Sequence, residues 1–593
     1  VEGAALDWQI LPARVEAVIA ERIGRLPEPL RAELLVASVE GETFTAEVVA
    51  RVQAASEGDV VGHLSRSLDR RHRLVRAQSI LWMDDQRLSR YRFRHILFQR
   101  YLYNSLDAVE RAHLHAAVGN TLETLHEGQT DALSATAATG EVAGQLAWHF
   151  QEAGIAAKAI DYLREAGDRA VRLCAYQEAR AHLRRGLELL LNLPGSRERD
   201  QQELALQLSL GLAWIRHGAF GPEQVGAAFT RARELGKQMD KESQLCRVLG
   251  ELAVFHFVRA EHRQAREFAA EAFSLAQQSG DPLLVALGHW QQGFVSFGLG
   301  RFTAARAHFQ QVISFYEPQE HHQSLVSLRG SDAGVNALSF DACCLWALGY
   351  PEQALQRSKD VLALARELGH PVSLADVLAF GACMPTKMRR DACALKDHAE
   401  ELMRLSKEKA FAGWLATGTC YRGEAVAMLG QFQEGIAQMR EGMTAEQALG
   451  TRLNQLGVLC TLALTQAKAG RPEDGLTTLA EALARLEQTD ERHWEPDVHR
   501  VRGELLLMQG QEAEAEASFH HAESCFRRAI EVARQQKAKS WELRATTSLA
   551  RLWQRQGKQE QARLVLAEIY DWFTEGFETT DLIEAKALLD DLS

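Results

Sequence analysis

The sequence feature that most constrains the fold is an internal repeat with a period near 40 residues. Glycines that precede short apolar runs serve as anchors for aligning the copies: Gly300, Gly349, Gly430, Gly470, Gly510 and Gly557. The residue seven before each anchor and the residue five after it are always small: Gly293, Ala342, Gly423, Ala463, Gly503 and Ala550, then Ala305, Ala354, Gly435, Gly475, Ala515 and Ala562. A bulky apolar residue stands nine after the anchor in all copies but one: Phe309, Met439, Leu479, Phe519 and Leu566, with Ser358 as the exception. Small residues let two helices approach closely and bulky ones fill the space between neighbouring pairs, so the pattern predicts stacked helix hairpins.

Two degenerate copies extend the repeat toward the N-terminus, with Ala260 and Cys174 at the anchor position. The pattern resembles the tetratricopeptide repeat, whose hairpins carry small residues at these offsets around a glycine turn. The anchors fall 40, 49, 81 or 47 residues apart, rather than the usual ~34, so one copy is unmarked. Proline, which interrupts helices, occurs only 12 times in 593 residues. We therefore expect an all-α superhelical solenoid over residues 153–593, looser than a standard array.

The segment 27–105 has a different pattern, which predicts a small winged-helix domain. Apolar spacing indicates three short helices, near 30–38, 44–52 and 57–71. Two alternating runs that flank the polar tip at 84–86 then predict a β-hairpin. Three helices followed by a hairpin are typical of a winged helix.

The remaining boundaries follow from composition. Residues 1–26 are expected to be a helical connector from an upstream module, since the chain begins with Val and no signal segment precedes the first helix. Residues 106–152 are expected to be a second helical connector, with Asp107 and Glu110 placed as a capping box and a polar linker over 127–140. Residues 316–336 are an atypical insertion between two repeat helices.

A short basic island stands out in a chain whose net charge is −12. Residues 63–101 hold 10 Lys or Arg against 3 Asp or Glu. The candidate docking face comprises Arg66, Arg70, Arg71, Arg73, Arg92 and Arg94. A winged helix would offer such a face to phosphates, but Glu57 and Asp59 stand at the start of the helix that would read the bases, where they repel DNA. We expect docking on another protein domain, with DNA binding as the open alternative.

Motifs for bond chemistry are absent from the sequence. There is no G-x-x-x-x-G-K-[ST] loop, no H-E-x-x-H and no G-x-S-x-G. The nine cysteines include no C-x-x-C pair, which fits a reducing cytoplasm. His520, His521, Glu523 and Cys525 point around one helix and are interpreted as a solvated face rather than a metal site. We therefore expect no enzyme activity, cofactor or metal in this chain, and no membrane span because no apolar run reaches ~18 residues.

Long segments, rather than short motifs, carry a resemblance to a known family. Residues 11–52, 91–123 and 146–190 look like the part of bacterial STAND-type signalling ATPases that follows the nucleotide-binding module. Residues 533–589 are similar to the end of the subgroup of predicted ATPases or adenylate/guanylate cyclases with tetratricopeptide repeats. The resemblance implies an upstream ATPase domain, often behind a cyclase, kinase or DNA-binding module. It further implies that the winged helix clamps the nucleotide domain and that the repeats act as a sensor.

These observations together predict the regulatory, sensing segment of a multidomain signalling ATPase. The first helix of each hairpin is expected to face the inside of the superhelix. The candidate residues for binding a protein or small-molecule inducer there are His289, Trp290, Trp414, Tyr421 and Arg422. Partners would be that inducer and the upstream ATPase domain, with oligomerisation on activation left open. The alternatives are a DNA-binding transcriptional regulator and an adenylate/guanylate cyclase or ATPase whose activity belongs to the parent protein.

Overall fold

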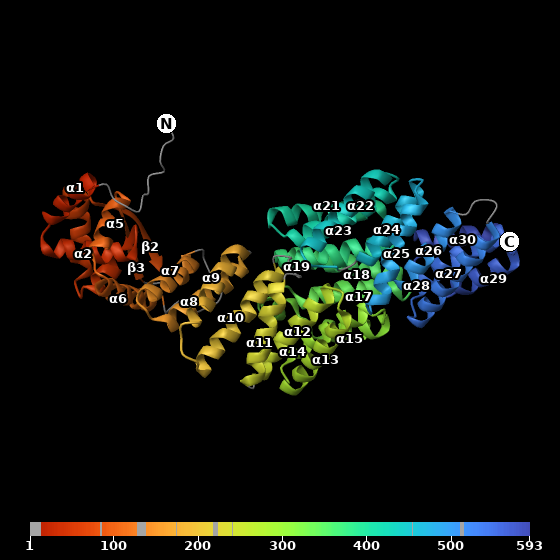
Figure 1. Cartoon of the computed structure of the whole chain (residues 1–593), viewed down its shortest axis with the longest axis horizontal. Coiled ribbons are helices and arrows are strands. Elements are labelled where there is room, and N and C mark those ends of the chain that lie inside the picture. The colour runs from red at the N-terminus through yellow and green to blue at the C-terminus, as the bar shows by residue number, and fades with distance from the viewer. Residues whose placement is uncertain are drawn as a thin grey trace. The chain divides into compact units, whose positions relative to one another are not determined.

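The computed structural model describes residues 13–83, 86–126, 138–173, 175–216, 223–239, 241–452, 455–509 and 515–593. The chain forms two compact units. The first consists of Val1–Ala170 and Ala181–Gln202, and the second of Val171–Arg180 and Glu203–Ser593. In Figure 1 the first unit runs from red to orange and the second from yellow to blue.

The first unit contains the three helices and the hairpin that the sequence predicts. Its elements are α1 (Ala13–Gly24), α2 (Glu28–Glu40), β1 (Thr43–Thr45), α3 (Ala46–Val52), α4 (Glu57–Gly62), the π-helical η1 (His63–Arg71), β2 (Val75–Met83), β3 (Gln86–Phe93), α5 (Ile96–Ser105), α6 (Ala108–His126) and α7 (Ala138–Glu152). The strands form one antiparallel sheet in the order β1-β3-β2, in which Phe44 pairs with Tyr91 and Ala77 also pairs with Tyr91. This order of elements is the one expected of a winged helix.

The helices on either side of this domain share its core. Ile19 and Ile23 of α1, and Val118 and Leu122 of α6, are buried in the same apolar cluster as Phe44 of the sheet. The segments expected to be connectors therefore help to fold the first unit. The expected linker lies mostly outside the described residues.

The predicted capping box at the start of α6 is present. The Asp107 carboxylate accepts hydrogen bonds from the backbone N–H groups of Val109 and Glu110, both at 2.8 Å. In return the Glu110 carboxylate accepts from the Asp107 N–H at 3.2 Å. The reciprocal pair satisfies N–H groups that have no partner within the helix.

Helix hairpins make up the rest of the chain, which confirms the predicted all-α solenoid (Figure 1). The helices before the insertion are α8 (Ala156–Arg172), α9 (Tyr176–Leu190), α10 (Arg197–Arg216), α11 (Glu223–Gln238), α12 (Glu242–Val258), α13 (His262–Ser279), α14 (Pro282–Gly298) and α15 (Phe302–Phe315). The insertion is a short helix, α16 (Pro318–Arg329). The next helices are α17 (Ala333–Ala347), α18 (Pro351–Leu368), α19 (Pro371–Asp376) with the π-helical η2 (Val377–Cys383) and α20 (Met384–Met388), and α21 (Ala392–Glu408). The last helices are α22 (Ala412–Met428), α23 (Phe432–Ala448), α24 (Gln455–Lys468), α25 (Pro472–Gln488), α26 (Glu495–Gln509), α27 (Ala515–Gln535), α28 (Lys539–Arg555), α29 (Gln559–Tyr570) and α30 (Thr580–Asp591).

The small positions of the repeat let the two helices of a hairpin meet, as predicted. A Cβ atom added at Gly293 of α14 would lie 2.6 Å from the ring of Phe309 on α15. At Gly423 of α22 it would lie 2.8 Å from the backbone nitrogen of Met439 on α23. The copy around Gly503 differs, because Phe526 rather than Phe519 covers that glycine at 2.5 Å. Its anchor Gly510 lies outside the described residues, as does Cys174.

The anchors are glycines because the hairpin turns need a left-handed backbone. The φ angles of the five described anchor glycines lie between 68° and 97°, and Ala260 has φ 64°. The copy that the sequence left unmarked turns at Arg390, with φ 61°. Arg390 lies 41 residues after one anchor and 40 before the next, so it restores the period. The alignment missed it because the turn residue is not glycine.

Successive turns of the superhelix touch one another, so the expected loose array is wrong. The Arg452 N–H donates to the Val258 carbonyl, the Arg492 N–H donates to the Gly298 carbonyl, both at 2.8 Å, and the Ser540 hydroxyl donates to the Trp346 carbonyl at 2.6 Å. The partners in each pair are 194 residues apart. One superhelical turn therefore takes about five repeats of about 40 residues. None of the described helices is both long and apolar enough to cross a membrane.

Candidate functional site

Three of the five predicted inducer-binding residues are buried on the inner layer of helices. Trp290, Trp414 and Tyr421 expose 1%, 5% and 3% of their surface. The indole N–H of Trp290 donates to the side-chain oxygen of Asn336 at 2.8 Å. Burial raises the pKa of Tyr421 well above its ordinary value. These side chains fill the core as they stand.

The other two predicted residues lie on a different side of the same helices. His289 is 3.0 Å from His308, between the two Nδ1 atoms, and packs against Phe273. Arg422 forms ion pairs with Glu400 at 3.0 Å and Glu434 at 3.1 Å. Consecutive residues on an α-helix point about 100° apart, so His289 cannot share the face of Trp290.

The inner face near Trp290 and Trp414 is almost closed. The Arg329 guanidinium stacks 3.7 Å from the Trp290 ring centroid. Arg329, Asp376 and Trp414 line a cavity of only about 30 Å³. Burial raises the pKa of Asp376 to about 6, although Arg329 acts in the opposite direction. A space of this size holds water rather than an organic ligand.

The predicted basic face of the first unit divides into two groups. Arg92 is paired with Glu42 at 2.7 Å, and Arg94 is paired with Asp69 at 2.6 Å. The other four predicted residues are exposed, with no ion pair in the described part of the chain: Arg66, Arg70, Arg71 and Arg73. Only the second group is free to meet a partner. The acids Glu57 and Asp59 are exposed at the start of α4.

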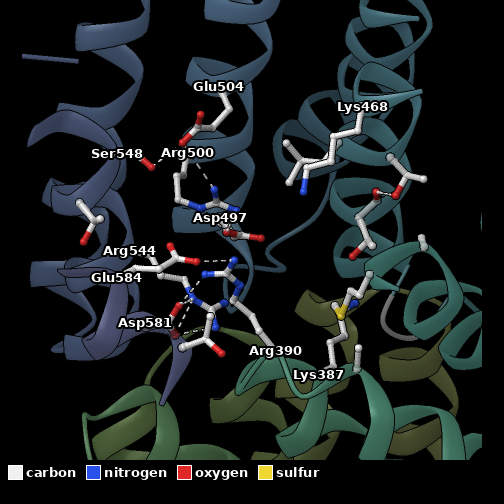
Figure 2. Close-up of a pocket in the computed structure, with 18 of the residues that line it drawn as sticks. Lys387, Arg390, Lys468, Asp497, Arg500, Glu504, Arg544, Ser548, Asp581 and Glu584 are labelled. Carbon is white, nitrogen blue, oxygen red and sulfur yellow. Dashed lines mark hydrogen bonds and ion pairs between the residues drawn. The ribbon is translucent and has the colours of Figure 1, made fainter. Parts of the chain in front are cut away.

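A larger cavity, of about 400 Å³, lies where two superhelical turns meet. Its walls come from the turn between α20 and α21 and from helices α24, α26, α28 and α30, which are distant in sequence (Figure 2). The charged residues of the lining are Lys387, Arg390, Lys468, Arg500, Arg544, Arg551, Asp497, Glu504, Asp581 and Glu584. This cavity was not predicted, because its residues follow no local spacing.

Ion pairs at the base of the cavity join the two turns. Arg390 contacts Asp581 at 3.3 Å and Glu584 at 2.9 Å. Arg544 also contacts Asp581, at 2.8 Å, and Arg551 contacts Glu584, at 2.9 Å. Although burial alone would raise it, the two guanidinium groups hold the pKa of Glu584 below its ordinary value. Arg390 and Glu584 are again 194 residues apart, so this ionic contact continues the series of contacts between turns.

A second, fully buried pair lies beside the first. The Lys387 ammonium donates to the Glu424 carboxylate and lies 4.6 Å from the Trp494 ring centroid. Lys387 exposes 6% of its side chain and Glu424 none. Burial raises the pKa of Glu424, and the neighbouring ammonium opposes that rise.

One basic residue of the cavity differs from the others. Lys468, at the end of α24, is exposed and has no ion pair or hydrogen bond of its side chain among the described residues. Figure 2 shows its side chain extending into the open space opposite Arg500. Arg500 itself is held by Asp497 at 2.7 Å. Lys468 is therefore the cation that a ligand could reach without breaking an ion pair.

Arg390 stands in a strained backbone conformation at the base of this cavity. Its φ of 61° costs a residue with a Cβ about 1–2 kcal/mol, a cost that glycine avoids at most other anchors. Observed strain of this kind clusters at sites where function requires a particular side chain. No group of three or more His, Cys, Asp or Glu side chains able to hold a metal occurs among the described residues, His520 and His521 included.

Comparison with known proteins gives one relative by sequence. No protein-family model matches the chain. An uncharacterized protein of Rhizobium meliloti (strain 1021) is 25% identical over 476 residues, which are 78% of this chain and 43% of that protein. The chain thus spans less than half the length of this relative.

Several solved structures share the repeat architecture. They include a Rap protein complexed with Competence and Sporulation Factor (11% identity, TM-score 0.34, 74% of this chain and 100% of that one). They also include the apo form of the quorum sensor NprR from B. thuringiensis (12% identity, TM-score 0.39, 63% and 97%). A third is a STAND protein with a tetratricopeptide repeat sensor from Pyrococcus horikoshii (11% identity, TM-score 0.30, 100% and 67%). Similarity at this level carries no function to this chain, and the cyclase subgroup stays a prediction.

Proposed function

We propose that this chain is the effector-sensing, regulatory segment of a larger signalling ATPase, and that the effector binds in the cavity at Arg390. The observation that carries the proposal is the position of that cavity. Its lining joins residues from two successive superhelical turns through Arg390, Asp581 and Glu584. An effector that occupies the cavity would therefore change the strength of a contact between turns, which is what a sensor must do.

The mechanism would be a shift between two arrangements of the repeats. A ligand moves such an equilibrium only by its difference in affinity for the two states. To change a ratio of 1:99 into 99:1, the effector must favour one state by about 5.5 kcal/mol. Charged contacts between turns suit this role, because each can be exchanged for a contact with the ligand.

In this proposal the catalytic activity belongs to other parts of the parent protein. The chain carries no phosphate-binding loop or cyclase motif, so ATP hydrolysis or cyclic nucleotide synthesis would take place upstream. The homologous segment in the Rhizobium meliloti protein is likewise one part of a longer chain. The exposed arginines of the first unit, Arg66 and Arg70 among them, would dock on the acidic surface of a nucleotide-binding domain.

Filling the cavity tests the proposal. Leu464 lines the cavity and is half-buried, so Leu464→Trp places an indole where the effector would bind. The matched control is Leu564→Trp, at a residue of α29 that is 56% exposed and outside the lining. A metabolite library is screened by thermal unfolding of the full chain. Compounds that raise the midpoint of the wild type and of Leu564→Trp should fail with Leu464→Trp, and an equal response of both variants would refute the cavity as the site.

The docking role has its own test. Arg66→Glu with Arg70→Glu should weaken association with a co-expressed nucleotide-binding domain, because both side chains are exposed and unpaired. Arg92→Glu is a poor choice, since it would place a second acid beside Glu42. If the double variant instead abolishes selection of one DNA duplex from a random pool, the transcriptional regulator becomes the better interpretation.

A further inference from the structure

We infer that the ligand of this cavity is a small organic oxyanion, bearing a carboxylate or a phosphate, and that Lys468 is the residue that reads its charge. The inference rests on the proposed function and adds the chemical class of the effector. It follows from the balance of charge on the cavity wall, from the pairing of each charge, and from the size of the space.

The lining has a surplus of positive charge. It holds six basic side chains and four acidic ones. A fifth acid, Glu424, lies buried beneath the wall and neutralises Lys387. One positive charge is thus left without a counter-charge, and Lys468 is the residue that carries it, because it has no ion pair among the described residues.

The acids of the wall have no capacity left for a cationic ligand. Asp581 is shared by the guanidinium groups of Arg390 and Arg544, and Glu584 by those of Arg390 and Arg551. A cation entering the cavity would meet carboxylates that are already neutralised and would be repelled by the surplus charge. An oxyanion would meet the opposite situation, since guanidinium groups carry five N–H donors each and can accept a second partner.

Size and lining further narrow the ligand. About 400 Å³ lies in the range of small-molecule sites and is too small for a folded partner. Apolar groups also line the space, among them Trp494 and the partly exposed side chains of Met428 and Met508. A metabolite with one or two acidic groups and an apolar or ring-shaped body fits these walls.

The strained turn at Arg390 agrees with this assignment. The other described turns of the aligned repeat are made by glycine or, once, by alanine. Retaining an arginine with a left-handed backbone at this one turn places a guanidinium at the base of the cavity. An oxyanion that competes with Glu584 for this guanidinium would loosen the ionic contact between the two turns, which links ligand binding to the superhelix.

Titration of the full chain with simple probes tests the assignment. Inorganic phosphate and citrate are titrated separately at constant ionic strength, with glucose as a neutral probe and spermidine as a cationic one. Either anion should bind saturably, whereas glucose and spermidine should not. A preference for citrate would indicate a carboxylate ligand, and a preference for phosphate a phosphorylated one. Failure of both anions at ~20 mM would overturn the inference, because charged hydrogen bonds at two or three groups support affinity in the millimolar range.

Variants of Lys468 separate this site from general surface charge. Lys468→Met should weaken the preferred anion by about tenfold or more, because a charged hydrogen bond is lost. Lys468→Arg should bind within about threefold of the wild type, since the charge is kept. The matched control is Lys359→Met, at another exposed lysine without an ion pair in the described residues. Equal binding by Lys468→Met and the wild type would disprove the role of Lys468.

The Leu464→Trp variant distinguishes failure of this inference from failure of the proposed function. If it abolishes binding of the anion, both stand. If it abolishes binding of an effector that proves to be neutral or cationic, the cavity remains the sensing site and the oxyanion assignment is wrong. If the anion still binds to Leu464→Trp, the anion site lies elsewhere and the inference fails.

Discussion

The aromatic inner face around Trp290 and the charged cavity around Arg390 lie in the same repeat unit, yet they are built in different ways. The first comes from neighbouring hairpins, and its side chains pack into a space of only about 30 Å³. The second comes from helices nearly 200 residues apart and leaves about 400 Å³ open. Large side chains on the inner helices therefore close the solenoid, whereas paired charges between its turns keep space for a ligand.

The two regions also treat ionisable groups differently. Near Trp414 the buried Asp376 has no ion pair within the described residues, and its pKa is raised. In the cavity Asp581 and Glu584 are each held by two guanidinium groups. The difference predicts that charge removal will destabilise the cavity region and relieve the aromatic region.

The largest effect is expected at the buried pair beside the cavity. Glu424→Ala should lower the free energy of unfolding by about 3–5 kcal/mol, because it leaves the Lys387 ammonium buried without a counter-charge. Chemical denaturation of the full chain measures this change. The double variant Lys387→Met with Glu424→Leu should recover most of the loss, and a double variant as unstable as the single one would show that the pair is not the cause.

The opposite sign is expected at Asp376. Because its pKa in the folded protein is about 6, above the ordinary 3.8, the folded state binds the proton more tightly and loses stability as the pH rises toward 6. Asp376→Asn removes this loss, so relative to the wild type the variant should gain up to about 3 kcal/mol between pH 4 and pH 7. Denaturation midpoints of both proteins at the two pH values measure the gain. A difference that does not change with pH would contradict the raised pKa.

The helix contacts should respond according to what covers the glycine. Gly423→Leu should cost about 1–3 kcal/mol or somewhat more, because its neighbours are backbone atoms of α23 that cannot rotate away. Gly293→Leu, in the aromatic region, should cost less, since the Phe309 ring can move. The denaturation midpoints of the two variants give the comparison, and equal values would show that side-chain rotation offers no relief.

The smallest effect concerns the strained turn. Arg390→Ala and Arg390→Gly lose the same ion pairs, but glycine adopts the left-handed backbone without cost. Arg390→Gly should therefore be more stable than Arg390→Ala by about 1 kcal/mol. Gly430→Ala, at the next anchor with φ 88°, should lose a similar amount. The strain at Arg390 would be refuted if alanine there proved as stable as glycine.

Local spacing was enough to predict much of the fold. The anchors Gly300 and Gly430 turn with positive φ, and the capping box at Asp107 forms, because each depends on residues close in sequence. The same method failed at Arg390, where a side chain replaced the expected glycine. It also could not separate the inner face of Trp290 from the side of His289, since adjacent helical residues point in different directions.

The sequence alone determined the all-α hairpin architecture, the position of its turns and the basic character of residues 63–101, because these follow from periodicity and local backbone preferences. Only the tertiary structure decided which charges are neutralised and where space remains. Arg390, Lys468 and Glu584 are far apart in the chain and have no shared motif. They meet because about five repeats complete one superhelical turn, a property of the accumulated rotation between hairpins that no short segment encodes.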